Sequence, residues 1–138
     1  MATTIIFNDI QNYLNAIADK SGIIAGSPHK RFWNIPYQSF VTANVPHASC
    51  DDGSPVPILN NNKVNPMLDP LQSPFYRILF DPAGVCGNPQ MPEGGPLATD
   101  QGYSVLLPDG TTITGTQIKS NIESWLSNGF PETASIVI

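Results

Sequence analysis

The chain has 138 residues, of which 41% are hydrophobic and only 12% are charged, and its formal net charge is −5. This length predicts a single domain, residues 1–138, that buries about two thirds of the surface its unfolded form exposes. The acidic balance argues against nucleic acid and anionic membranes as partners, because both are bound through clustered Lys and Arg.

No apolar run reaches the roughly 20 residues that a membrane-spanning helix needs, so the sequence predicts a soluble protein. The N-terminus also lacks a basic region ahead of an apolar one, which is the pattern of a signal peptide. We therefore expect a cytoplasmic location for the chain as given. Export by a non-classical apparatus and a removed signal peptide both stay open.

Three helices are expected in the first 80 residues. Over 5–19, apolar residues recur at intervals of three or four, as on one face of a helix. Shorter helices are expected over 36–44 and 74–80, each with a proline in its first turn. The Pro- and Asn-rich segment 45–74 is expected to be irregular, because its prolines oppose long helices and central strands. Its apolar residues are expected to anchor it to the core: Val56, Ile58, Leu59, Met67, Leu68 and Leu71.

The last third of the chain carries two further signals. Two β-prone runs surround a Pro-Asp-Gly turn and predict a β-hairpin over about 103–114. Thr114 and Gln117 have the spacing of a capping box at the start of a final helix, residues 118–126. Gly129 is placed to end that helix in a left-handed conformation.

Cys50 and Cys86 are the two cysteines of the chain. If bonded, they would close a loop of about 37 residues and stabilise the fold by about 4 kcal/mol in a chain-entropy model. The alternatives are two reduced, buried thiols or a divalent metal site. His47, Cys50 and Asp51, joined by Cys86 or His29, contain enough donors for zinc, although zinc sites usually show two tight ligand pairs.

Three motifs taken together resemble a cytochrome c-like domain. They are the Phe-x-x-Ile-x-x-x-Leu pattern of the first helix, the Met91-Pro92-x-Gly94-Gly95-Pro96 loop, and Ile118-x-x-x-Ile122-x-x-Trp125-Leu126-x-x-Gly129-x-Pro131 at the end. In such domains the Met-Pro loop supplies an axial haem ligand. The resemblance implies a mainly α fold with long Pro/Gly-rich loops, in which the hairpin is an insertion before the C-terminal helix.

The Cys-x-x-Cys-His motif that attaches haem is absent from the sequence. The resemblance therefore implies a haem-less variant, and no cofactor is expected. Aromatic side chains would have to fill the vacated space, because a large apolar void costs several kcal/mol. The candidates for this filling are Phe32, Trp33, Tyr37, Phe75 and Phe80.

These features favour a non-catalytic binding, accessory or cargo-type protein whose partner is another protein. Its expected partner-binding loop consists of Met91, Pro92, Glu93, Gly94, Gly95 and Pro96, because ordered loops commonly carry function. One alternative is a secreted or injected effector, toxin or enzyme that uses the 47–52 and 84–96 loops. A second is an electron-transfer protein with a metal at His47 or a non-covalent haem between Met91 and His29. No catalytic residue is assigned.

Overall fold

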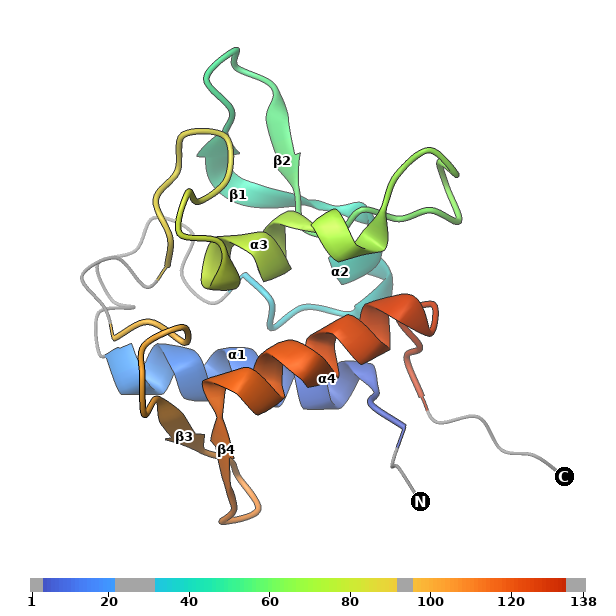
Figure 1. The fold of residues 1–138 in the computed structure, drawn as a ribbon. Helices are drawn as coiled ribbons and strands as arrows, with labels where there is room; N and C mark the ends of the chain where they lie inside the picture. The colour runs from blue at the N-terminus through green and yellow to red at the C-terminus, as the bar shows by residue number, and fades with distance from the viewer. Residues whose placement is uncertain (1–3, 22–31, 92–95, 134–138) are drawn as a thin grey trace, which may run out of the picture.

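The computed structural model describes residues 4–21, 32–91 and 96–133 (Figure 1). Within these ranges, the helices nearest the two ends of the chain pack against each other, and the middle section, with a short sheet and long loops, lies on one side of them (Figure 1). The elements in order are α1 (Phe7–Ser21), α2 (Tyr37–Thr42), β1 (Asn44–Ser49), β2 (Pro55–Pro57), the 3-10 helix η2 (Pro70–Gln72), α3 (Pro74–Phe80), β3 (Ser104–Leu106), β4 (Thr112–Thr114) and α4 (Gly115–Ser127).

The prediction of a mainly α, cytochrome c-like fold is wrong. Of the described residues, about 39% are helical and 13% are in strands, and the strands form two separate antiparallel sheets of two strands each. The sheet of β1 and β2 is unexpected, because prolines occupy this segment. Proline is tolerated here because each strand of a two-stranded sheet is an edge strand. Pro57 lies opposite Asn44, and Pro55 lies opposite Ser49.

The predicted hairpin is confirmed. Strands β3 and β4 pair with Val105 opposite Ile113, and both of these side chains are buried. The neighbouring positions of each strand face outward, as the two-residue period of a strand requires. The turn between the strands is closed by the Gly110 N–H, which donates to the carbonyl oxygen of Leu107 at 2.9 Å.

Helix α4 packs between α1 and α3 and carries the centre of the core. Trp125 is fully buried, and its ring lies 6.1–6.4 Å from the rings of four phenylalanines, measured between centroids. Aromatic rings at such distances and tilts attract each other beyond the area they bury. The four rings are those of Phe7 in α1, Phe40 in α2, Phe75 in α3 and Phe130 after α4. The Trp125 side chain therefore packs against four separate parts of the chain.

Both ends of α4 follow the sequence prediction. Thr114 and Gln117 form the capping box, with the Gln117 N–H donating to the Thr114 hydroxyl at 3.1 Å. Gly129 has φ of +87°, and the following N–H of Phe130 donates back to the Trp125 carbonyl at 2.8 Å. The chain then returns to α1, where the Phe7 N–H donates to the Pro131 carbonyl at 3.2 Å.

Of the aromatic side chains expected to fill the core, Trp33, Phe75 and Phe80 are buried and Phe32 and Tyr37 are partly buried. Tyr37 also donates its hydroxyl to the Phe130 carbonyl at 2.7 Å. The aromatic residues therefore fill the interior as their volume predicts.

Candidate functional site

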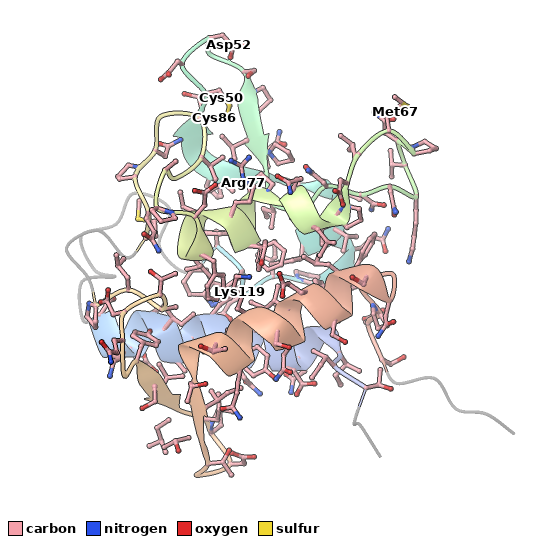
Figure 2. The ribbon with its side chains drawn as sticks, viewed as in Figure 1. Cys50, Asp52, Met67, Arg77, Cys86 and Lys119 are labelled. Carbon is pink, nitrogen blue, oxygen red and sulfur yellow. A yellow bond between two sulfur atoms is a disulfide. The ribbon has the colours of Figure 1, made fainter. Side chains whose placement is uncertain are left out.

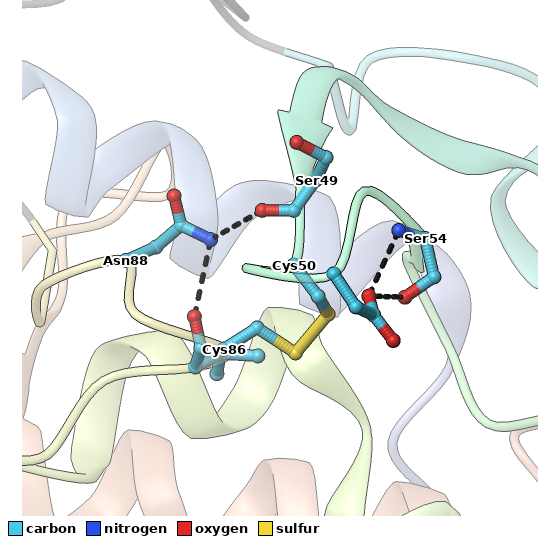
Figure 3. Close-up of a disulfide and its surroundings, with 7 residues drawn as sticks. Ser49, Cys50, Ser54, Cys86 and Asn88 are labelled. Carbon is cyan, nitrogen blue, oxygen red and sulfur yellow. Dashed lines mark hydrogen bonds between the residues drawn. A yellow bond between two sulfur atoms is a disulfide. The ribbon is translucent and has the colours of Figure 1, made fainter.

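The first candidate site is the junction of two loops at one end of the molecule. Cys50, which directly follows β1, is bonded to Cys86 (Figure 3), so the disulfide is the one of the alternatives left open by the sequence that the structure shows. Beside this bond, the Asn88 side-chain amide donates to the Ser49 carbonyl at 3.3 Å and to the Val85 carbonyl at 3.1 Å. The disulfide therefore holds the two loops together, as expected for bonded cysteines.

The disulfide changes the metal hypothesis. A sulfur atom in a disulfide is not the thiolate that binds zinc, so Cys50 and Cys86 are not ligands while they are bonded. Within the ranges that the structure describes, no group of three or more His, Cys, Asp and Glu side chains could hold a metal ion. The side chain of His47 and all of His29 lie outside those ranges. Asp51 is exposed beside the disulfide.

Asp52 lies at the tip of the β1–β2 hairpin, and its side chain makes hydrogen bonds within the turn there. Its carboxylate accepts hydrogen bonds from the Ser54 hydroxyl at 2.6 Å and from the Ser54 N–H at 2.9 Å. These hydrogen bonds hold the pKa of Asp52 below its usual value. The carboxylate therefore stays ionised and stabilises the turn, which is a structural task.

The predicted Met91–Pro96 partner loop is described only at its two ends. Met91 is partly buried, and its N–H donates to the Ile78 carbonyl of α3 at 2.8 Å. Pro96 is exposed, and residues 92–95, which include Glu93, lie outside the described residues. A partner-binding role for this loop stays a prediction, as does Met91 as a haem ligand.

A second candidate site is a loop that the sequence did not single out, residues 61–71, called the 61–71 loop below. It projects from the molecule with Met67 at its tip (Figure 2). Met67 is 90% exposed and Val64 is 74% exposed, and Leu68 and Leu71 are exposed as well. The expectation that Met67, Leu68 and Leu71 anchor this segment is therefore wrong.

The 61–71 loop is ordered by its own polar side chains. Asparagine or aspartate recurs at every fourth position, and each carboxyl or amide oxygen accepts the N–H of the residue two positions later. Such turns fix the backbone, and the last of them caps the short 3-10 helix η2. The three pairs are Asn61 with Lys63, Asn65 with Met67 and Asp69 with Leu71, at 2.9, 3.1 and 3.0 Å.

The base of the 61–71 loop is fixed to the core at two points. Asn61 is buried, and its amide donates to the Val41 carbonyl of α2 at 3.1 Å. Lys63 donates its ammonium to the Gly129 carbonyl at 2.8 Å and lies 4.4 Å above the centroid of the Phe130 ring. The apolar side chains are therefore held outward by a scaffold that is itself tied to the protein interior.

Comparison with known proteins gives no relative for this chain. No family model, no curated protein and no solved structure matches it. These comparisons neither support nor refute the resemblance of the three sequence motifs to cytochrome c-like domains, although the mainly α fold that it implied is wrong. Within the described residues, no helix is both long enough and apolar enough to cross a membrane.

Proposed function

We propose that the protein is a binding module that docks on another protein through the 61–71 loop. The observation that carries this proposal is the clustering of exposed apolar side chains. Five large hydrophobic residues in the described ranges are exposed, and four of them belong to this loop. Exposed apolar residues scattered singly need no explanation, but a contiguous group commonly marks an interaction site.

The kind of side chain also supports docking on a protein. Methionine is flexible and polarisable, and such side chains are frequent on surfaces that bind protein grooves. Fully burying one methionine yields about 1.5–3 kcal/mol relative to leaving it exposed. The expected partner therefore has an apolar groove that accepts Met67 at its centre, with Val64 and Leu71 at its edge.

The order of the loop supports binding at a low entropic cost. A flexible loop loses about 1–2 kcal/mol of conformational free energy for each residue that becomes fixed on binding. The hydrogen bonds of Asn61, Asn65 and Asp69 already fix much of this backbone in the free protein. Most of the free energy gained by burying the apolar side chains would then contribute to affinity.

Site-specific cross-linking tests this proposal. A photoreactive amino acid is placed at Met67, or at Leu106 as the matched control, and the protein is expressed in the cells that produce it. Leu106 is also exposed, at 66%, but it lies on β3. We expect one defined partner to cross-link at position 67 and not at position 106. Unlabelled wild-type protein should compete with this product, and unlabelled Met67→Asp protein should not.

Two results would contradict the proposal. Equal products from both positions, or equal competition by wild type and Met67→Asp, would mean that the 61–71 loop is not the docking surface. Because Met67 is almost fully exposed, its replacement should leave the thermal stability of the isolated protein unchanged.

We also infer that the chain works in an oxidising compartment. The Cys50–Cys86 bond supports this inference, because structural disulfides are rare where glutathione keeps thiols reduced. Of the locations that the sequence leaves open, export fits the bond better than the cytoplasm. Alkylation of thiols before lysis, followed by intact-mass measurement, tests it: an unalkylated protein supports an oxidising compartment, and a doubly alkylated protein contradicts it.

A further inference from the structure

Met67 is the one docking residue of the 61–71 loop that a peroxide can change chemically. Its exposed apolar neighbours in the loop, Val64, Leu68 and Leu71, have aliphatic side chains, and no other residue of the loop contains sulfur. A methionine thioether, by contrast, is readily oxidised to the sulfoxide. Oxidation of this loop therefore falls on the side chain that lies at its tip (Figure 2).

The sulfur of Met67 is open to solvent. The residue is 90% exposed, the highest value among the exposed large hydrophobic residues of the described ranges. Of the two other methionines, Met91 is partly buried and Met1 lies outside the described residues. Because the rate of oxidation of a sulfur group follows its exposure, Met67 is expected to react before Met91.

The backbone keeps Met67 at the tip. The Asn65 side chain accepts the Met67 N–H at 3.1 Å, and the Asn65 carbonyl accepts the next N–H, that of Leu68, at 3.0 Å. These two hydrogen bonds close a turn around Met67. The side chain is therefore presented outward by a fixed backbone, which leaves its sulfur unprotected.

The cysteines do not compete with Met67 for a peroxide. Both are bonded to each other, and the chain has no free cysteine. A peroxide oxidises the thiolate form of cysteine, which a disulfide lacks. The thioethers are therefore the sulfur groups left to react, and Met67 is the exposed one in the described ranges.

The reaction with hydrogen peroxide balances without a further reagent. The Met67 sulfur attacks one peroxide oxygen, an S–O bond forms, the O–O bond breaks, and the other oxygen leaves as water with both protons. The sulfur loses two electrons and the peroxide gains them. The product carries a polar S–O group, and burying a polar group in an apolar groove without a hydrogen-bond partner is unfavourable.

We propose that Met67 is a modification site, at which oxidation to the sulfoxide by a hydroperoxide releases the protein from its partner. The inference rests on the proposed docking function of the 61–71 loop and adds a regulation of that surface. The fold is not affected, because the new oxygen is added to an exposed side chain and the hydrogen bonds of the turn come from the backbone N–H groups.

Peptide mapping after limited treatment with hydrogen peroxide tests the chemical step without any partner. We expect the peptide with Met67 to gain one oxygen atom before the peptide with Met91 does. Equal rates, or faster oxidation of Met91, would overturn the proposal. This result would leave the docking function untouched, because docking does not require that Met67 reacts first.

The cross-linking assay tests the release. Peroxide-treated wild type, oxidised at Met67 and not at Met91, is added as the unlabelled competitor of the product formed from position 67. At least about tenfold more of it than of untreated wild type should be needed for the same competition. Met67→Leu is the matched control, because it keeps an apolar side chain that does not oxidise, and peroxide should not change its competition.

The outcomes separate this inference from the docking proposal. If untreated wild type does not compete, the docking function is wrong and the modification site falls with it. If untreated wild type competes and oxidised wild type competes equally well, or if peroxide weakens wild type and Met67→Leu alike, only the modification site is overturned. A lower melting temperature of the protein oxidised at Met67 would also overturn it, since the release would then come from unfolding.

Discussion

Replacing Asn61 with alanine tests whether the 61–71 loop is held from its base. Asn61 is 8% exposed, and its side chain makes two hydrogen bonds: to the Val41 carbonyl at 3.1 Å and from the Lys63 N–H at 2.9 Å. Alanine removes both. Leaving a buried carbonyl unpaired costs about 1–3 kcal/mol, and losing the second bond costs about 1 kcal/mol. We therefore expect the free energy of unfolding to fall by about 2–4 kcal/mol.

Urea unfolding followed by tryptophan fluorescence measures this change, because the fully buried Trp125 reports on the core. Asn65→Ala is the matched control. Asn65 is exposed and its side chain accepts a hydrogen bond from the Met67 N–H at 3.1 Å, so its loss should cost about 1 kcal/mol or less. Equal losses in the two variants would refute the reasoning, since they would mean that the buried anchor of Asn61 adds nothing.

Three further predictions concern covalent and ionisable groups. Reduction of Cys50–Cys86, whose residues are 36 apart in sequence, should lower the free energy of unfolding by about 4 kcal/mol in urea experiments with and without reductant; a loss below about 1 kcal/mol would contradict this. The pKa of Tyr103 is raised from 10.0 to about 12, so the unfolded chain gives up this proton first and stability should fall as the pH rises from 10 to 12. Tyr103→Phe should reduce that fall, and an unchanged slope would argue against it. The hydrogen bond from Tyr76 is the main cause that lowers the pKa of Glu123 below 4.5. The stability that this carboxylate contributes should therefore be present above pH 4.5 and lost as the pH falls through its folded value. Acid titration of Glu123→Gln should show a smaller loss than wild type, and an identical curve would count against the assignment.

Local signals in the sequence predicted the last quarter of the chain well. The capping box of Thr114 and Gln117, the closing Gly129 and the hairpin before them all depend on residues within a few positions of each other. Such signals are read directly from spacing. The sequence could only offer the Cys50–Cys86 bond as one alternative to reduced thiols. The choice depends on whether two loops far apart in the sequence come close together, which only the structure shows.

The fold class was wrong because motif order does not determine how elements pack. The motifs do bring the two ends of the chain together, because Phe7 contacts both Trp125 and Pro131. However, two-stranded sheets occupy regions that helix periodicity could not describe. The prolines at 55 and 57 argued against long helices and central strands, but they did not exclude the edge strands that the segment forms.

The 61–71 loop was missed because apolar residues were equated with the core. Met67 and Leu71 are apolar, as residues that anchor a loop to the core usually are. The turns at Asn65 and Asp69 instead direct this segment away from the interior. The available signal was the recurrence of Asn or Asp at every fourth residue with apolar residues between them.

The affinity of the purified protein for its cross-linked partner tests the docking surface most directly. Titration should compare wild type with Met67→Asp and with Leu106→Asp, since both side chains are exposed in the isolated protein. Burial of Met67 in an apolar groove predicts that Met67→Asp weakens binding at least about tenfold, while Leu106→Asp leaves the dissociation constant nearly unchanged. Equal dissociation constants for wild type and Met67→Asp would contradict the assignment of the 61–71 loop as the binding surface.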